Sequence, residues 1–144
     1  MSCDIEFKKL HPDARLPTPA TKDSAGFDLY AMEGGRLVPG ERKLVKTGIA
    51  MALEPFSVGL ICPRSGLALK RGVTVLNAPG VIDADYRGEL GVILVNLSQE
   101  RFYYDVGDRI AQLVVFRYPL VRAWEVDELS PTDRGSGGFG SSGV

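Results

Sequence analysis

The stretch PGVIDADYRGELGVILVNL, residues 79–97, begins as an acidic turn and ends as an apolar strand. Gly, Pro and Asp favour tight turns, whereas the Val, Ile and Leu residues that follow favour strands. One interpretation is a plain hairpin. The other is a rigid hairpin that presents Asp83 and Tyr86 to a ligand, because binding residues often lie on loops braced by a scaffold. The rest of the sequence decides between the two.

Short apolar or alternating runs, separated by Gly, Pro and Asp, continue on both sides of this stretch. Such a pattern, without a long segment of helical period, predicts an all-β barrel, sandwich or jelly roll. The expected strands cover residues 5–10, 43–53, 58–62, 73–76, 90–97, 101–106, 110–118 and 121–126. One short helix is expected within residues 62–72, with Ser65 as its N-cap and Gly72 at its C-terminal end.

The composition narrows the class of function. At 144 residues, with 44% hydrophobic and 24% charged residues, the chain reads as one globular domain. No apolar run approaches the roughly 20 residues of a membrane-spanning helix, and the N-terminal sequence lacks the apolar region of a secretory signal. The net charge of −1 disfavours nucleic acid as a partner. We therefore expect a cytoplasmic protein that binds neither nucleic acid nor membrane, while a small anionic ligand stays open.

Histidine and cysteine are scarce in this chain. His11 is the only histidine, in an expected surface turn, and Cys3 and Cys62 lack the CxxC spacing of zinc or redox sites. Cys62 is expected to be a buried apolar residue. Unless His11 is recruited, these residues offer neither a soft-ligand metal site nor a catalytic triad. Any catalysis is therefore expected to depend on carboxylates.

The composition changes after residue 129, which divides the chain into a β domain, residues 1–129, and a Gly/Ser-rich arm, residues 130–144. A segment without packable periodicity is expected to be mobile. It is either a frayed tail or an arm that closes over a ligand. Arg134 and Phe139 favour the second interpretation, because a cation and an aromatic ring suit an anionic, ring-bearing ligand.

Five segments remain once the strands are set aside: AGFDLYA (25–31), PRSGLALK (63–70), GVIDADYRG (80–88), GDRIAQL (107–113) and RGSGGFGSSG (134–143). Each alone has a structural explanation. Together, in this order and spacing, they resemble the five motifs of the trimeric deoxyuridine triphosphatase (dUTPase) family. The resemblance implies an all-β jelly-roll protomer of the β-clip type with one short helix. It also implies a homotrimer with shared active sites and Mg²⁺-assisted hydrolysis of dUTP to dUMP and pyrophosphate.

The resemblance assigns roles to the hairpin residues. Asp83 would activate the water that attacks the α-phosphorus, a role that suits an ionised carboxylate. Tyr86 would pack beneath the deoxyribose, where a 2′-hydroxyl would clash. Asn77 and the hairpin backbone at Val81 would read the edge of uracil. Asp85 is expected to be structural.

The resemblance also places residues on the phosphates and the metal. Arg64, Ser65 and Gly66 would face the phosphates at the start of the helix, and Gln112 would contact a phosphate. Asp28 and Arg109 would form a supporting charge network. Mg²⁺ would be held through the triphosphate, with Asp28 at most touching its water shell.

In the arm, the resemblance gives Arg134 a contact with the γ-phosphate and stacks Phe139 over the uracil. The backbone N–H groups around Gly140 would bind the phosphate chain as an anion-binding nest. The arm would close over the site of a neighbouring subunit.

Three alternatives stay open. A dCTP deaminase has a related fold and a GVID-like motif, but it needs a glutamate where this chain has Ile93. A non-catalytic nucleotide-binding trimer would keep the fold without turnover. A structural β protein without a ligand would leave the five-motif match to coincidence.

Overall fold

A computed structural model describes residues 4–143 as β structure with one short helix. The strands are β1 (Ile5–Lys9), β2 (Thr18–Pro19), β3 (Gly26–Tyr30), β4 (Gly35–Leu37), β5 (Arg42–Leu53), β6 (Ser57–Cys62), β7 (Val73–Val75), β8 (Gly80–Ile82), β9 (Glu89–Asn96), β10 (Phe102–Tyr104) and β11 (Arg109–Arg117). The helix α1 spans Ser65–Arg71. The predicted all-β fold with one short helix is confirmed.

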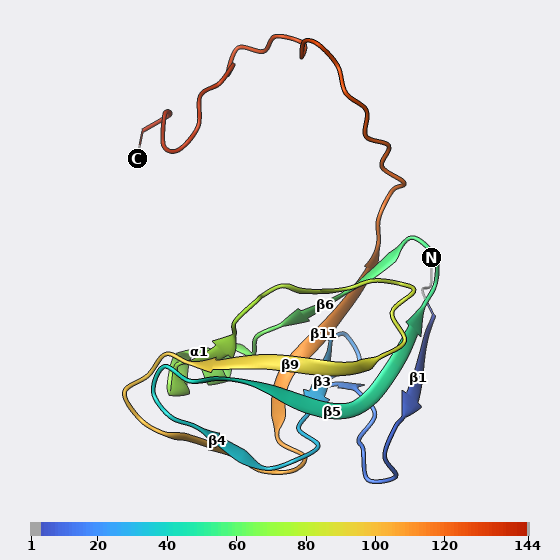
Figure 1. The fold of residues 1–144 in the computed structure, drawn as a ribbon, viewed down its shortest axis with the longest axis vertical. Coiled ribbons are helices and arrows are strands. Elements are labelled where there is room, and N and C mark those ends of the chain that lie inside the picture. The colour runs from blue at the N-terminus through green and yellow to red at the C-terminus, as the bar shows by residue number, and fades with distance from the viewer. Residues whose placement is uncertain (1–3, 144) are drawn as a thin grey trace.

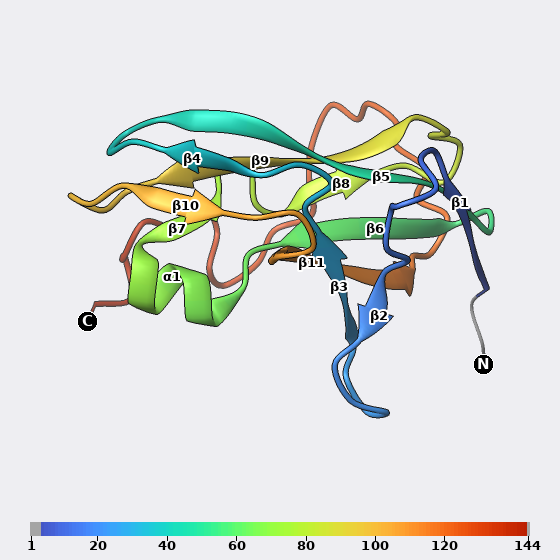
Figure 2. The same ribbon diagram turned by 90° about the horizontal axis from the view of Figure 1, so that it is seen from below.

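The strands form two main sheets, both antiparallel. One has the order β1-β5-β9-β7 and the other β2-β3-β11-β6-β8, while β10 and β4 form a separate pair. Two views at right angles show the two sheets lying over one another, with α1 at one end (Figures 1 and 2). A sandwich of this kind buries the inner face of each sheet.

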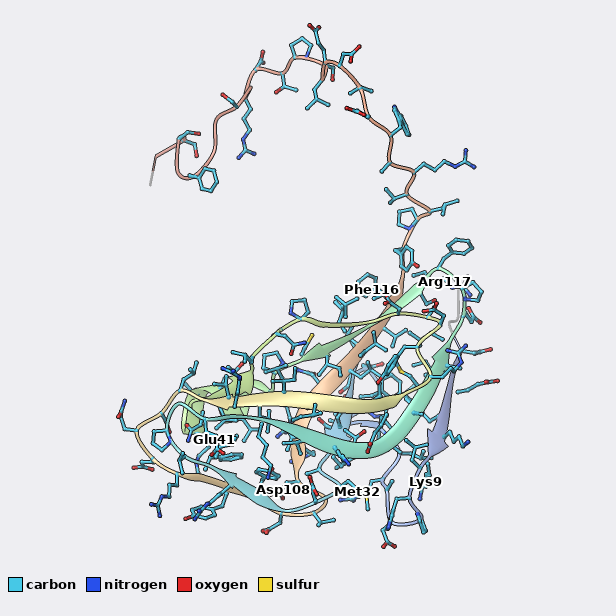
Figure 3. The ribbon with its side chains drawn as sticks, in the orientation of Figure 1. Lys9, Met32, Glu41, Asp108, Phe116 and Arg117 are labelled. Carbon is cyan, nitrogen blue, oxygen red and sulfur yellow. The ribbon has the colours of Figure 1, made fainter. Side chains whose placement is uncertain are left out.

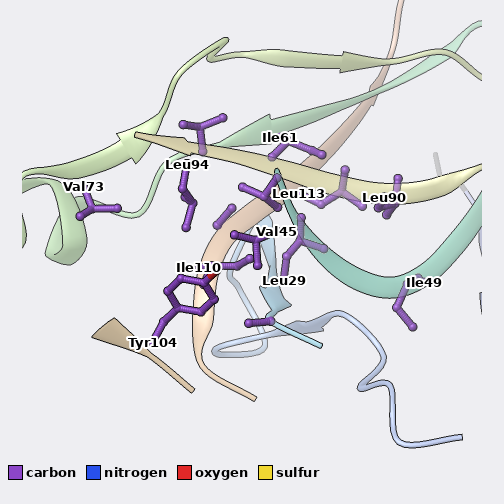
Figure 4. Packing of buried hydrophobic residues seen from close by; sticks show 14 of the residues in the cluster. Leu29, Val45, Ile49, Ile61, Val73, Leu90, Leu94, Tyr104, Ile110 and Leu113 are labelled. Atoms are coloured by element: carbon purple, nitrogen blue, oxygen red, sulfur yellow. The ribbon is translucent and has the colours of Figure 1, made fainter. Parts of the chain in front are cut away.

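The core lies between these two sheets. On β9, the side chains of Leu90, Val92 and Leu94 alternate inward, and each is fully buried. Leu113 on β11 is also fully buried and faces them from the other sheet (Figure 4). Burying one such side chain contributes about 1.5–3 kcal/mol. The alternation of apolar residues along these strands therefore accounts for most of the packing.

Truncating one of these side chains should lower stability, because each is fully buried in the core. We expect Leu113→Ala to reduce the free energy of unfolding by about 2–5 kcal/mol, the usual range when a core Leu leaves a cavity. Leu69→Ala on α1 is the matched control, because Leu69 is 87% exposed. Urea unfolding at one protein concentration measures both changes, and an equal loss in the two variants would contradict this account of the core.

The structure confirms the predicted C-terminal end of the helix and corrects its predicted N-cap. Gly72 is confirmed as the C-cap, with a left-handed φ of 63° and an N–H that bonds to the carbonyls of Leu67 and Ala68. Ser65 is not the N-cap. Arg64 takes that position in an extended conformation, and no side chain caps the helix. The helix therefore begins one residue earlier than the capping pattern predicted, with Ser65 as its first residue.

Three other expectations need correction. Residues 121–126 form no strand, and the chain beyond Arg117 runs away from the body as a long arc (Figure 1). The short strands β2, β3, β4 and β8 were not predicted. Cys62 is half-buried rather than buried, because it points to the outer face of its sheet. Cys3 lies outside the described residues.

Candidate active site

An ion-pair network lies where β3, β11 and the β6–α1 junction meet. Asp28 Oδ1 lies 3.5 Å from Arg64 Nε, and Asp28 Oδ2 lies 3.7 Å from Arg109 Nη1. Arg64 Nη1 also donates a hydrogen bond of 3.3 Å to the carbonyl of Arg109. The Asp28 side chain is only 13% exposed, whereas that of Arg109 is 51% exposed. Two guanidinium groups and one carboxylate leave one net positive charge, so this arginine cluster (Asp28, Arg64, Arg109) suits an anion.

Gln112 joins the arginine cluster from β11. It pairs with Asp28 on β3 and with Cys62 on β6, and its Nε2 donates a 3.0 Å hydrogen bond to the carbonyl of Pro63. Gly26 leaves room for this side chain, since a Cβ at Gly26 would overlap Gln112 Oε1. The amide is therefore held against two neighbouring strands, beside the chain that enters α1.

Ser65 and Gly66 follow directly at the start of α1. Both are exposed, and a Cβ built at Gly66 would meet no atom within 4 Å. The structure thus brings Arg64, Gln112, Asp28 and Arg109 together, with Ser65 and Gly66 open to solvent beside them.

The predicted hairpin is not formed, because β8 pairs with β6 in one sheet and β9 pairs with β5 and β7 in the other. The loop that links the two sheets and the residues before it carry a second group of side chains, which keeps the name hairpin group. Val81 is 61% exposed and Tyr86 43% exposed, and Asn77 and Asp83 lie beside them. The turn closes through the Tyr86 N–H, which donates to the Asp83 carbonyl at 3.1 Å. The Asp83 carboxylate has no ion-pair partner among residues 4–143. This hairpin group (Asn77, Val81, Asp83, Tyr86) is available for a ligand.

The third group lies on the arm, far from the other two. Phe139 is fully exposed with a positive φ of 53°, and Gly140 follows with a φ of 85°. Arg134 Nε donates a 2.8 Å hydrogen bond to the carbonyl of Gly137 within the arm itself. Of the residues described, none beyond Tyr118 donates or accepts a hydrogen bond across to the body. Figure 3 shows the chain past Phe116 and Arg117 running away from the body with its side chains in open space.

The register of the five-stranded sheet separates the hairpin group from the arginine cluster within one chain. Gln112 pairs with Cys62, whereas Asp83 follows Ile82, which pairs with Gly59. Asp83 therefore lies level with Val58, four residues along β6 from Cys62; at about 3.4 Å per residue and about 4.8 Å per strand, this offset and two strand spacings amount to roughly 17 Å. That is too far for Asp83 and Gln112 to act on one phosphate group.

The described residues hold no ready metal cage. Within residues 4–143 no three His, Cys, Asp or Glu side chains gather around a common point. Asp28, the carboxylate of the arginine cluster, is already paired with two guanidinium groups. His11 lies in an exposed turn, as expected, and its Nδ1 accepts the Asp13 N–H at 3.2 Å. No helix in the described part of the chain is long and apolar enough to cross a membrane.

Sequence reasoning missed two residues that shape the site. Gly26 admits the Gln112 side chain, and a glycine inside a strand is a known sign of such a close approach. Glu89 accepts a hydrogen bond from the Gly48 N–H at 2.8 Å and carries the carbonyl that binds the Tyr86 hydroxyl. No local pattern indicates the contact with Gly48, because it joins residues 41 apart.

The fold and these exposed groups define an all-β protein equipped to bind a small anionic ligand. A model of the dUTPase family matches residues 12–143. Curated relatives named deoxyuridine 5′-triphosphate nucleotidohydrolase occur in Wolinella succinogenes, 52% identical over 96% of this chain and 93% of the relative, and in Nautilia profundicola, 50% identical over 96% and 98%. The chain belongs to the dUTPase family.

Solved structures agree with this assignment. The dUTPase of Staphylococcus bacteriophage 80alpha, solved with dUPNHPP, matches with a TM-score of 0.87 and 32% identity over 98% of this chain and 99% of that one. A mutant dUTPase of phage phi11 of S. aureus, described with a structural Mg(II) ion, matches with a TM-score of 0.82 and 25% identity over 89% and 99%. The fold described above is therefore the fold of these enzymes.

Proposed function

We propose that this protein hydrolyses dUTP to dUMP and pyrophosphate. The observation that carries the proposal is the family match over residues 12–143, which includes all five motif segments. The names of the relatives and the dUTP analogue in a related phage enzyme support the choice of substrate.

The chemistry is assigned to the hairpin group. Asp83 orients a water molecule and accepts its proton while the water oxygen attacks the α-phosphorus. The bond from that phosphorus to the oxygen bridging to the β-phosphate breaks, and pyrophosphate leaves with the electron pair. A carboxylate without an ion-pair partner in the described chain can serve as such a base.

The hairpin group also selects the nucleoside. Asn77 and the backbone at Val81 bind the edge of uracil, and the Tyr86 ring packs against the deoxyribose. The structural support is that all three are exposed in the segment between β7 and β9, with Tyr86 held by its hydroxyl. A 2′-hydroxyl would then clash with the tyrosine ring, so UTP would be a poor substrate.

The phosphates are assigned to the arginine cluster with Gln112, Ser65 and Gly66. One net positive charge, a fixed amide and an open helix start favour a polyanion at this place. Arg134, Phe139 and the backbone around Gly140 would cover the bound nucleotide from the arm. Their lack of hydrogen bonds to their own body supports that role.

We infer that the active protein is a homotrimer with shared sites. Roughly 17 Å separates Asp83 from Gln112 within one chain on the strand geometry above. A site in which both act on one phosphate group therefore draws them from different subunits. The chain leaves its own body after β11, and the arm at its end, residues 130–144, would supply the third part of the site (Figure 1).

Mg²⁺ is the proposed cofactor. The residues fit an ion held by the triphosphate rather than by a protein cage, because Asp28 is already paired with Arg64 and Arg109. Asp28 would contact the metal only through its water shell. When bound, the ion would neutralise charge on the departing pyrophosphate.

Parallel incubations with Mg²⁺ and dUTP, dCTP, UTP or dTTP test the substrate. We expect pyrophosphate from dUTP, with the other three slower by at least about 10²-fold, because a site built on specific contacts rejects misfits by that much or more. Assays for pyrophosphate, phosphate and ammonia are run together. Ammonia from dCTP would mean a deaminase in spite of Ile93, and no product from any nucleotide would mean a protein that only binds.

A further inference from the structure

We propose that Glu89 is a positioning residue for sugar selection, acting through Tyr86. Its carboxylate is bound to the Gly48 amide, and this anchor fixes the backbone carbonyl that holds the Tyr86 hydroxyl. The inference rests on the proposed function, which places the Tyr86 ring against the deoxyribose. It goes beyond that function because Glu89 itself does not touch the nucleotide.

Two contacts set the position of the Tyr86 ring. Its hydroxyl donates a 3.0 Å hydrogen bond to the Glu89 carbonyl. The ring lies close on Gly88, where a Cβ would overlap the hydroxyl oxygen and come within 2.6 Å of Cζ and 3.0 Å of Cε2. The backbone of residues 88–89 therefore supports the Tyr86 ring, and a shift of that backbone would shift the ring.

A bulge in β5 fixes the backbone of residues 88–89. Lys46 pairs with Gly91 and Ala50 pairs with Glu89, so β5 carries extra residues between two ladder positions. The Gly48 N–H consequently meets the Glu89 side chain, donating to Oε1 at 2.8 Å, instead of a backbone carbonyl of β9. Bulges of this kind commonly re-aim groups beside active sites.

The anchor point itself is rigid. Gly48 has a φ of 69°, and a Cβ there would come within 2.8 Å of the Ala14 Cβ and 3.0 Å of the Met32 sulfur. Its carbonyl accepts the Leu10 N–H at 2.8 Å. Met32 lies near the bend of β5 that carries the bulge (Figure 3). A packed glycine with both backbone groups bonded gives the Glu89 carboxylate a fixed partner.

A second hydrogen bond at the same bulge offers a control that distinguishes sugar selection from general stability. Thr47 Oγ1 donates a 2.6 Å hydrogen bond to the Leu90 carbonyl, and both residues are buried. This bond also joins β5 to β9, but it does not involve the carbonyl that holds Tyr86. Loss of the Thr47 hydrogen bond should therefore lower the stability of the protein and leave the position of the Tyr86 ring unchanged.

The test compares kcat/KM for dUTP with kcat/KM for UTP, expressed as a ratio, in the full-length protein. We expect Glu89→Ala and Tyr86→Phe each to lower this ratio by about tenfold, because a ring that can move tolerates a 2′-hydroxyl. Glu89→Gln keeps an acceptor oxygen for the Gly48 N–H and should restore the wild-type ratio. Thr47→Val should lower the melting temperature and leave the ratio unchanged.

The outcomes separate this inference from the proposed function. A wild-type protein that cleaves dUTP selectively, with an unchanged ratio in Glu89→Ala, overturns the inference alone. Equal losses for both nucleotides in Glu89→Ala mean a purely structural residue and also overturn it. A wild-type protein that does not prefer dUTP overturns the proposed function, and the inference falls with it.

Discussion

Asp83→Asn should lower kcat for dUTP by about 10²–10⁴-fold, the usual contribution of a general base. Asparagine keeps the size and the hydrogen-bonding shape of the side chain but cannot accept the proton of the attacking water. Because the Asp83 carboxylate has no ion-pair partner in the described chain, the exchange breaks no salt bridge. Stability and affinity for the analogue dUPNHPP should therefore stay close to the wild-type values.

Asp85→Asn provides the matched control for this variant. Asp85 lies in the same turn, two residues further along, and the same chemical change is made there. Its turnover should stay within about twofold of wild type, since Asp85 is exposed, has no ion-pair partner in the described chain and is given no role on the nucleotide. Single-turnover kinetics with calorimetric binding separate the two variants. If Asp83→Asn kept the wild-type rate, or if both variants lost it equally, the assignment of the base would be wrong.

Much of the fold could be predicted from the sequence because short apolar runs bounded by turn residues favour strands. The run after Glu89 is apolar at almost every position, and β9 has nearly the predicted bounds. The failure at residues 121–126 has the same origin. Apolar residues favoured a strand there too, but a strand also needs a hydrogen-bonding partner, and the described chain offers none at that place. Short strands such as β8 are set by pairing with β6 rather than by local pattern.

The site was predictable as a set of residue types but not as an arrangement. The carboxylate, the arginines and the glutamine could be found from their motifs. The sequence does not reveal that Asp28 is shared by Arg64 and Arg109, because those contacts join residues 36 and 81 positions from Asp28. The anchor from Glu89 to Gly48 depends on a bulge in β5. A bulge depends on which residues of two strands face each other, and β5 and β9 are far apart in the sequence.

Removing residues 132–144 should lower kcat/KM for dUTP on the order of 10²–10³-fold, the usual cost of losing preorganised donors to a phosphate or oxyanion. The fold should not suffer, because no described residue beyond Tyr118 forms a hydrogen bond with the body. Arg134→Ala should reproduce much of the loss. Arg122→Ala is the matched control, since Arg122 is also an exposed arginine of the arc. Unchanged kinetics in the truncated protein, with an unchanged melting temperature, would show that the arm is only a tail.

Mixing the truncated protein with the Asp83→Asn variant tests whether one site is built from different subunits. Asp83→Asn chains retain the arm, and truncated chains retain Asp83. If Asp83 and the arm of one site come from different subunits, mixed trimers contain sites with both parts intact. Random reassembly at equal concentrations should then restore activity at about a quarter of the sites. Recovery to this level after mixing and refolding would establish a site built across subunits, whereas the sum of the two residual activities would place Asp83 and the arm of each site on the same chain.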